Sequence, residues 1–141
     1  MSVFTRAATL ADIRQMAEIA GHSVTAGSLA DWMDVDSAYS AWHLVEDEVG
    51  RLLGFQHVGH SEALPADACE IASFFARIAL PPGASTKLFE TTAETARLLR
   101  YTWISASLAT DNEAARVYYQ TQGFRPYDQS LTHLKMRFDL D

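Results

Sequence analysis

Apolar residues along this chain recur with two different periods. A spacing of three to four residues, typical of a helix with one buried face, covers four stretches: 13–20, 28–33, 85–100 and 112–123. Short apolar or alternating runs, typical of strands, cover seven: 3–6, 41–45, 52–58, 69–79, 102–109, 124–127 and 131–138. This order predicts one α+β or mixed α/β domain over residues 1–141, with a mostly antiparallel sheet of six to seven strands flanked by about four helices.

The run over residues 69–79 differs from the other predicted strands. It carries one charge near its start, Glu70, and one near its end, Arg77. So few polar residues predict a strand buried on both faces and central in its sheet. Burying a carboxylate without a partner is costly, so Glu70 is a candidate functional group. The alternative is a position at a hydrated end of the strand.

Capping residues mark the starts of the first and last helices. Thr9 with Asp12 three residues later is typical of a capping pair. For the last helix, Asn112 is one candidate cap, and Thr110 with Glu113 forms a rival capping box. The sequence leaves these two alternatives open.

Composition is typical of a single globular domain. Apolar residues make up 48% of the 141 positions, and no run approaches the roughly 18 consecutive apolar residues of a membrane span. The N-terminus has no apolar stretch after a basic start, so no secretory signal is expected. A single cysteine, Cys69, fits a reducing compartment. These features predict a soluble cytoplasmic protein without membrane association.

The net charge of −7 is concentrated in one block, residues 15–50, which holds seven acids and no Lys or Arg. This acidic block consists of Glu18, Asp31, Asp34, Asp36, Glu46, Asp47 and Glu48. It disfavours nucleic acid as a partner, because nucleic-acid recognition requires a basic surface. A cationic substrate or partner is one interpretation. A solvated acidic face that serves solubility is the other.

Two histidines close in sequence, His57 and His60, are possible metal ligands by residue type, but their spacing argues against a metal site. Three residues apart on a strand, they point to opposite faces, and no cysteine or carboxylate completes a ligand set. We therefore expect no metal.

The last predicted helix carries a recognisable motif. Asn112, Ala115 and Tyr119 share one helix face, Gly123 ends the helix, and Phe124 begins a strand. The pattern Asn-x-x-Ala-x-x-x-Tyr-x-x-x-Gly-Phe resembles the C-terminal signature of the GCN5-related N-acetyltransferase (GNAT) family, which uses acetyl-coenzyme A (acetyl-CoA). The predicted order of elements is also that of the family's fold, so the resemblance covers almost the whole chain.

The resemblance implies acetyl-CoA as co-substrate, with its pyrophosphate bound by backbone amides before the long helix. The family has Gln/Arg-x-x-Gly-x-Gly/Ala there. This chain has Leu80 in place of the Gln or Arg, then two prolines, which lack N–H groups. Gly83 matches the first glycine and is followed by Ala84, Ser85 and Thr86. Considered alone, the segment is more simply a Pro-Gly turn that caps the helix, and Ser85 is a competent helix cap.

The resemblance also implies how the pantetheine arm is bound. The backbone of Phe74, Phe75 and Ala76 would pair with it like an added strand. Asn112 and Ala115 would contact the cofactor from the last helix. The residues themselves allow simpler interpretations. The two phenylalanine side chains can be core, and Asn112 can be only a cap.

Two residues are candidates for catalysis. The resemblance implies that Tyr119 donates a proton to the CoA sulfur, and a phenol with a pKa near 10 suits that role. Glu70 followed by Ile-Ala resembles the Glu-Ile of the histone-acetylating branch, where the glutamate deprotonates the amine through water. Tyr119 as a core residue is the alternative. Tyr118 points about 100° away on a helix and is expected to be packing.

These features together predict an acetyl-CoA-dependent N-acetyltransferase acting on a primary amine of a small molecule or peptide by direct attack on the thioester. The acidic block favours a cationic acceptor. The degenerate loop from Leu80 to Ser85 motivates an alternative, a GNAT-fold acyl-CoA sensor or partner-binding module with weakened catalysis. Exposed strand edges of this fold can pair, which leaves a homodimer open.

Overall fold

The computed structural model describes residues 2–21, 24–34 and 38–140. Within these ranges it has seven strands: β1 (Val3–Ala7), β2 (Ala41–Asp47), β3 (Leu52–Gly59), β4 (Ala68–Phe75), β5 (Trp103–Ala109), β6 (Arg125–Gln129) and β7 (His133–Asp139). Its α-helices are α1 (Ile13–Ala20), α2 (Ala26–Asp34), α3 (Ala84–Leu98) and α4 (Glu113–Gln122), and a 3-10 turn, η1 (Leu10–Asp12), precedes α1. The predicted order and fold class are confirmed.

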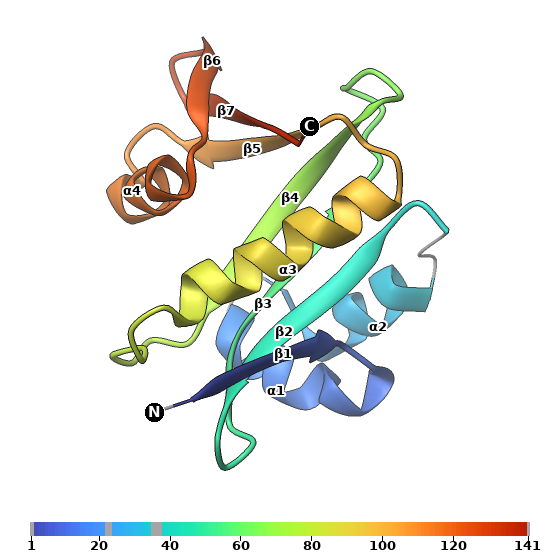
Figure 1. The fold of residues 1–141 in the computed structure, drawn as a ribbon, viewed down its shortest axis with the longest axis vertical. Coiled ribbons are helices and arrows are strands. Elements are labelled where there is room, and N and C mark those ends of the chain that lie inside the picture. The colour runs from blue at the N-terminus through green and yellow to red at the C-terminus, as the bar shows by residue number, and fades with distance from the viewer. Residues whose placement is uncertain (1, 22–23, 35–37, 141) are drawn as a thin grey trace.

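All seven strands form one sheet with the order β1-β2-β3-β4-β5-β7-β6, so β4 is central as predicted. Every neighbouring pair is antiparallel except β4 and β5, which run parallel. The parallel pair is short: it joins Ala68–Glu70 to Trp103–Ser105, although β4 continues to Phe75 and β5 to Ala109. The two central strands therefore separate after three residue pairs (Figure 1).

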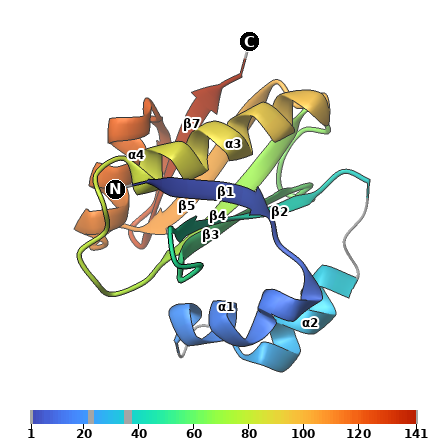
Figure 2. The ribbon, with the colours of Figure 1, turned by 60° about the horizontal axis from the view of Figure 1, so that its bottom comes forward.

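Helices cover both faces of the sheet. Figure 2 shows α1 and α2 together below one face, and α3 across the other face. Met16 and Leu29 pack from α1 and α2 onto Leu44 and Phe55 of the sheet. On the opposite side, Phe89 of α3 belongs to the largest core cluster, which also includes the α4 residue Tyr119 and the residue that follows α4, Phe124. The core is thus divided into layers above and below the sheet.

The first helix starts as its capping residues predict. The Thr9 amide donates to Asp12 Oδ2 at 2.8 Å, and the Asp12 amide donates to the Thr9 carbonyl at 2.9 Å. The Arg6 guanidinium from β1 donates to both Asp12 carboxylate oxygens, at 2.8 and 2.9 Å. This partner lowers the pKa of Asp12 to about 2. The capping carboxylate therefore also ties the start of α1 to the edge strand.

One prediction about β4 is wrong. The strand ends at Phe75 rather than Ala79, and it is not buried on both faces throughout: Ala68, Cys69 and Ile71 are buried, Glu70 is exposed, and residues 72–75 are half-buried. The reason is the separation from β5. Where the neighbouring strand turns away, the apolar side chains of β4 line a cavity rather than a closed core.

Candidate active site

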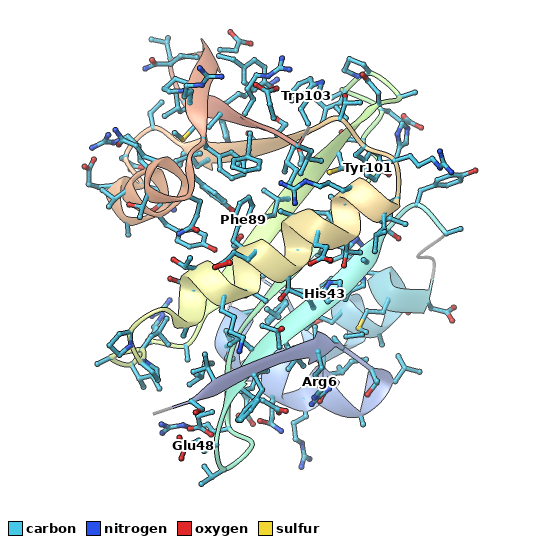
Figure 3. The ribbon with its side chains drawn as sticks, viewed as in Figure 1. Arg6, His43, Glu48, Phe89, Tyr101 and Trp103 are labelled. Carbon is cyan, nitrogen blue, oxygen red and sulfur yellow. The ribbon has the colours of Figure 1, made fainter. Side chains whose placement is uncertain are left out.

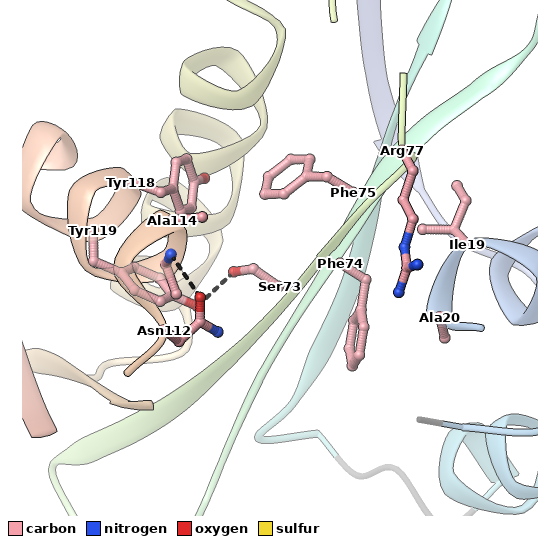
Figure 4. A pocket seen from close by; sticks show the side chains of 11 residues that line it. Ile19, Ala20, Ser73, Phe74, Phe75, Arg77, Asn112, Ala114, Tyr118 and Tyr119 are labelled. Carbon is pink, nitrogen blue, oxygen red and sulfur yellow. Dashed lines mark hydrogen bonds between the residues drawn. The ribbon is translucent and has the colours of Figure 1, made fainter. Parts of the chain in front are cut away.

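The separation of β4 and β5 opens a cavity of about 530 Å³ between β4 and α4 (Figure 4). Its walls come from the end of α1, the second half of β4 and the first two turns of α4. The lining residues are Ile19, Ala20, Ser73, Phe74, Phe75, Arg77, Asn112, Ala114, Ala115, Tyr118 and Tyr119. Five of the predicted site residues thus meet here: Phe74, Phe75, Asn112, Ala115 and Tyr119.

One wall of the cavity is a strand edge. β3 pairs with β4 from Glu70 to Phe75, so one side of this part of the β4 backbone is occupied by a neighbouring strand. On the other side, pairing with β5 stops at Glu70. Among the residues the structure describes, the backbone of 71–75 has no strand neighbour on this side, which is the geometry that accepts an extended polyamide as an added strand.

A glycine brings Phe75 into this wall. Gly54 on β3 pairs with Phe75, and a Cβ built at Gly54 would lie 2.5 Å from Phe75 Cδ1 and 2.9 Å from the Phe74 carbonyl oxygen. Phe75 in turn makes an edge contact with the Tyr118 ring, with ring centres 5.1 Å apart. Only glycine at position 54 leaves room for this arrangement.

The opposite wall is the start of α4, and Asn112 is its cap. Asn112 Oδ1 accepts from the Ala115 amide at 3.1 Å. The rival capping box is not formed, because Thr110 Oγ1 donates to the Leu131 carbonyl. At the other end Gly123 adopts the left-handed conformation with φ of 110°, as its position predicts. Asn112 both caps the helix and lines the cavity, so the cap does not exclude a cofactor contact.

Tyr119 projects from this helix toward β4. Its side chain is buried, at 6% exposure, and its hydroxyl donates to Ser73 Oγ at 2.8 Å (Figure 4). Burial raises the pKa of Tyr119 to about 12. The phenol is therefore protonated at neutral pH and is a weaker acid than the ordinary tyrosine that the sequence led us to expect.

Tyr118 is more than the packing residue that we expected. Its hydroxyl accepts from Gln56 Nε2 at 2.7 Å and donates to the Ser85 carbonyl at 3.0 Å. Burial raises its pKa as well. Gln56 lies on β3 and also donates to Ser73 at 3.1 Å. A chain of polar side chains thus lies behind the cavity.

The first turn of α3 is the other predicted contact region. Gly83, with φ of 81°, is the residue that caps the helix, so the expectation of Ser85 as cap is wrong. The Ala84 amide donates to the Pro81 carbonyl at 3.1 Å, and helical bonding begins with the Lys87 amide donating to Gly83. The amides of Ser85 and Thr86 therefore have no acceptor within the helix and are the donors that this turn offers.

The α3 turn stands beside the cavity rather than in its lining. Gly83, Ala84, Ser85 and Thr86 are not among the lining residues, and Ser85 is connected to them through Tyr118. Ala76, the last predicted pantetheine contact, lines an adjoining hollow of about 300 Å³.

Glu70 lies apart from Tyr119. It is exposed on β4, where it pairs with Gly59 and Ser105, in the part of β4 that still contacts β5. Three residues from Ser73 on a strand, it points to the opposite face. Glu70 is therefore at a hydrated position, and it is not brought together with Tyr119 in the cavity.

The acidic block does not gather at the cavity. Glu46 pairs with Arg6 and Asp47 with Arg51, and Figure 3 shows Arg6 and Glu48 at the β1 end of the molecule, away from Trp103. Asp36 lies outside the described residues. Glu18 reaches only the adjoining hollow, which it shares with Arg77. The charged side chain in the lining of the cavity itself is Arg77.

The two histidines occupy separate environments. His57 is buried between Trp32 and Trp42, with ring centres 4.7 and 4.5 Å away. His60 is exposed beyond the end of β3. Within residues 2–21, 24–34 and 38–140, no three His, Cys, Asp or Glu side chains are grouped to hold a metal ion.

Sequence reasoning missed Ser73, Gln56 and the role of Tyr118. Ser73 had a detectable signal, because it is an uncharged polar residue inside an apolar run. Gln56 is polar at the middle of an apolar strand, but its partners lie 17 and 62 residues away. Their proximity depends on the register of β3 with β4 and on the placement of α4.

Comparison of the sequence with known protein families and with curated proteins gives no match. Solved structures do match. The N-acetyltransferase of Staphylococcus aureus Mu50 superposes with a TM-score of 0.84 over 100% of both chains at 18% identity. The phosphinothricin acetyltransferase of Sinorhizobium meliloti, a GNAT-superfamily protein solved with acetyl-CoA, gives 0.84 over 99% of this chain and 89% of its own, at 16% identity.

A third neighbour is the ribosomal-protein-alanine N-acetyltransferase of Brucella melitensis, with a TM-score of 0.81 at 19% identity, over 97% of this chain and 99% of its own. At these identities the likeness establishes the architecture. The protein has the GNAT acetyltransferase fold, over essentially its whole length. None of the helices in the described part of the chain has the length and apolarity of a membrane span.

Proposed function

We propose that this protein is a GNAT N-acetyltransferase that transfers the acetyl group of acetyl-CoA to a primary amine of a small molecule or peptide. One observation carries the proposal: a buried tyrosine faces a free strand edge across a cavity at the point where two central strands separate. The fold shared with acetyltransferases supports it.

The walls fit the parts of acetyl-CoA. The free edge of β4 offers backbone N–H and C=O groups to the two amides of the pantetheine arm. Asn112 and Ala115 lie across from it on α4. The amides of Ser85 and Thr86, at the positive end of the α3 dipole, are suited to the pyrophosphate. The residues present therefore fit this co-substrate.

Bound acetyl-CoA supplies the acetyl carbonyl carbon, to which the amine nitrogen bonds as the carbon–sulfur bond breaks, giving an amide and a free thiol. The chain must then stabilise negative charge on sulfur and remove a proton from nitrogen. Tyr119 would support the first step as a neutral phenol whose proton, donated to Ser73 in this structure, turns to the sulfur when acetyl-CoA binds. Because its pKa of about 12 exceeds the roughly 8.5 of an ordinary thiol, it favours a hydrogen bond to sulfur over complete proton transfer.

Glu70 stays the proposed acceptor for the amine proton. Its exposure and its place on the opposite face of β4 from Ser73 mean that it would act through water rather than by direct contact. The acceptor amine would then approach from the α1 side of β4.

Two measurements test this function. Millimolar acetyl-CoA should raise the melting temperature, because it binds the folded chain only. Acetyl-CoA with a panel of primary amines, both cationic and carboxylate-bearing, should release free thiol. Cys69 is buried and burial raises its pKa to about 12, so the protein's own thiol should not react in this assay. No thermal shift at millimolar ligand would refute the proposal.

A second function has a specific observation in its favour. Pro81 and Pro82 provide no N–H groups and the Ala84 amide is occupied by Pro81, so the α3 turn offers few donors. An acyl-CoA sensor with weakened catalysis would show a thermal shift with acetyl-CoA but no thiol release with any amine. Thiol release above the uncatalysed rate would exclude it.

A further inference from the structure

Gln56 is a costly residue for the middle of a sheet. Its side chain is fully buried at 0% exposure, and its Oε1 has no hydrogen-bond partner among the described residues. An unpaired buried carbonyl of this kind lowers stability, because it gives up its hydrogen bonds to water without a replacement. An apolar side chain of similar length would avoid that cost, so the packing of β3 does not explain the glutamine.

The nitrogen of the same side-chain amide, in contrast, donates two hydrogen bonds. Gln56 Nε2 donates to Ser73 Oγ at 3.1 Å and to the Tyr118 hydroxyl at 2.7 Å. The Tyr118 hydroxyl in turn donates a hydrogen bond to the Ser85 carbonyl at the start of α3. The Gln56 amide on β3 thus contacts β4 and α4 directly, and α3 through the Tyr118 hydroxyl. These are the elements around the cavity that carry proposed functional groups.

Ser73 is where this network meets Tyr119. Its Oγ accepts from Gln56 at 3.1 Å and from the Tyr119 hydroxyl at 2.8 Å. A serine hydroxyl accepts two hydrogen bonds and donates one, so both acceptor positions are occupied and its own proton is left to donate. Ser73 lines the cavity, and that proton is available to a group inside it.

We propose that Gln56 and Ser73 are positioning residues for Tyr119, and that Ser73 presents a second hydroxyl donor to the acyl thioester. This inference rests on the proposed acetyl transfer. Gln56 and Tyr119 both donate to Ser73 Oγ, which fixes the serine and holds the phenol beside it. When acetyl-CoA binds, the single proton of Tyr119 would turn from Ser73 to the sulfur, while the Ser73 proton already faces the cavity. Once aligned, such donors stabilise the charge that develops as the carbon–sulfur bond breaks, without reorganising during the reaction.

The first test compares two variants of one position. Ser73→Ala should lower kcat about tenfold with KM for acetyl-CoA changed less than about twofold, as expected for an interaction made mainly in the transition state. Ser73→Thr keeps the hydroxyl and should stay within about threefold of wild type. Thr92→Val is the matched control, because it removes a buried hydroxyl on α3 that has no partner in the described structure and does not line the cavity.

Coupling to Tyr119 is tested by a double-mutant cycle. If Ser73 acts together with the phenol, Ser73→Ala should cost less than about threefold when added to Tyr119→Phe, instead of the tenfold in wild type. Gln56→Met should lower kcat about threefold to tenfold without lowering the melting temperature. Full additivity in the cycle, or unchanged kcat in Gln56→Met and Ser73→Ala, would overturn the inference.

A spectroscopic measurement separates this inference from the proposed function. In protein labelled with ¹³Cζ-tyrosine, the Tyr119 resonance, assigned with Tyr119→Phe, should shift in Ser73→Ala and stay in place in Thr92→Val. If acetyl transfer itself is absent, wild type releases no thiol, yet this shift still reports the contact. An unshifted resonance would show that Ser73 does not position Tyr119, whatever the activity.

Discussion

The two regions that would hold acetyl-CoA are built in different ways. The tyrosine wall (Gln56, Ser73, Tyr118 and Tyr119) is held by four side-chain hydrogen bonds of 2.7–3.1 Å, counting the one that Tyr118 makes to Ser85. The α3 start (residues 81–86) offers backbone amides behind a glycine with φ of 81°. Side chains thus determine the geometry near the thioester, whereas backbone conformation determines the pyrophosphate contact. Variants of the first region should change kcat, and variants of the second should change KM.

The largest effect is expected at the tyrosine wall. Tyr119→Phe should lower kcat about 10- to 100-fold, because the departing sulfur loses its hydrogen-bond donor, with KM for acetyl-CoA changed less than about twofold. Steady-state thiol release measures both constants. Tyr101→Phe is the control: Tyr101 is also buried and donates to the Tyr39 carbonyl, but it does not line the cavity. An unchanged kcat in Tyr119→Phe would remove this tyrosine from the mechanism.

A stability effect of about 2 kcal/mol is expected outside both regions, at Asp12. Arg6 lowers the pKa of Asp12 from 3.8 to about 2, and a pKa unit corresponds to about 1.4 kcal/mol. Because the folded-state pKa is lowered, this stability is fully present above about pH 4 and is lost as the pH falls toward 2.

Urea unfolding of Asp12→Asn should show the deficit at pH 7 and a smaller one at pH 3. The variant should keep the kcat of wild type, since Asp12 does not line the cavity. A deficit that stays constant from pH 7 to pH 3 would contradict the role of the Arg6 ion pair.

A smaller effect is expected at the α3 start. Gly83→Ala should cost about 1 kcal/mol of stability, because a residue with a Cβ is strained at φ of 81° although the added atom would meet nothing within 4 Å. Relaxation of the turn should also raise KM for acetyl-CoA about threefold to tenfold.

Gly50→Ala is a matched control, with φ of 83° and the same open surroundings in the turn between β2 and β3. Both variants should lose similar stability, and only Gly83→Ala should change KM. An equal KM in the two variants would mean that the α3 start does not bind the co-substrate.

The last prediction is that kcat stays constant as the pH is raised above neutral. The phenol of Tyr119 must be protonated to donate, and its raised pKa of about 12 keeps it protonated well above neutral pH. Between pH 8 and about pH 10, kcat should therefore not decline. A decline centred near pH 9 would assign the donor role to another group.

Local features of the fold were predictable. The Thr9–Asp12 cap and the left-handed Gly123 depend on residues within a few positions of one another, so spacing alone indicates them. For the last helix spacing left two caps open, and the structure shows that Asn112 is the cap. The order of elements follows from apolar periodicity, which is also local. These features define where helices start and stop, and they sufficed for the fold class.

Features that depend on distant segments were not predictable. The early end of β4 follows from its separation from β5, which no residue of β4 reveals. The contact of Tyr119 with Ser73 spans 46 residues, and that of Tyr118 with Gln56 spans 62. The raised pKa of Tyr119 is a product of burial, which appears only once α4 is packed against the sheet.

The short pairing between β4 and β5 has a consequence for how the protein unfolds in part. Three residue pairs connect the two halves of the sheet, and the contacts of Phe89 with Phe124 and Phe138 hold them together on the α3 side. The segment from β5 to β7 should therefore exchange its amide hydrogens through a partial unfolding that leaves β1–β4 intact. A molecule bound in the cavity bridges both halves, so acetyl-CoA should slow exchange across β5 and β7 as well as along β4 itself.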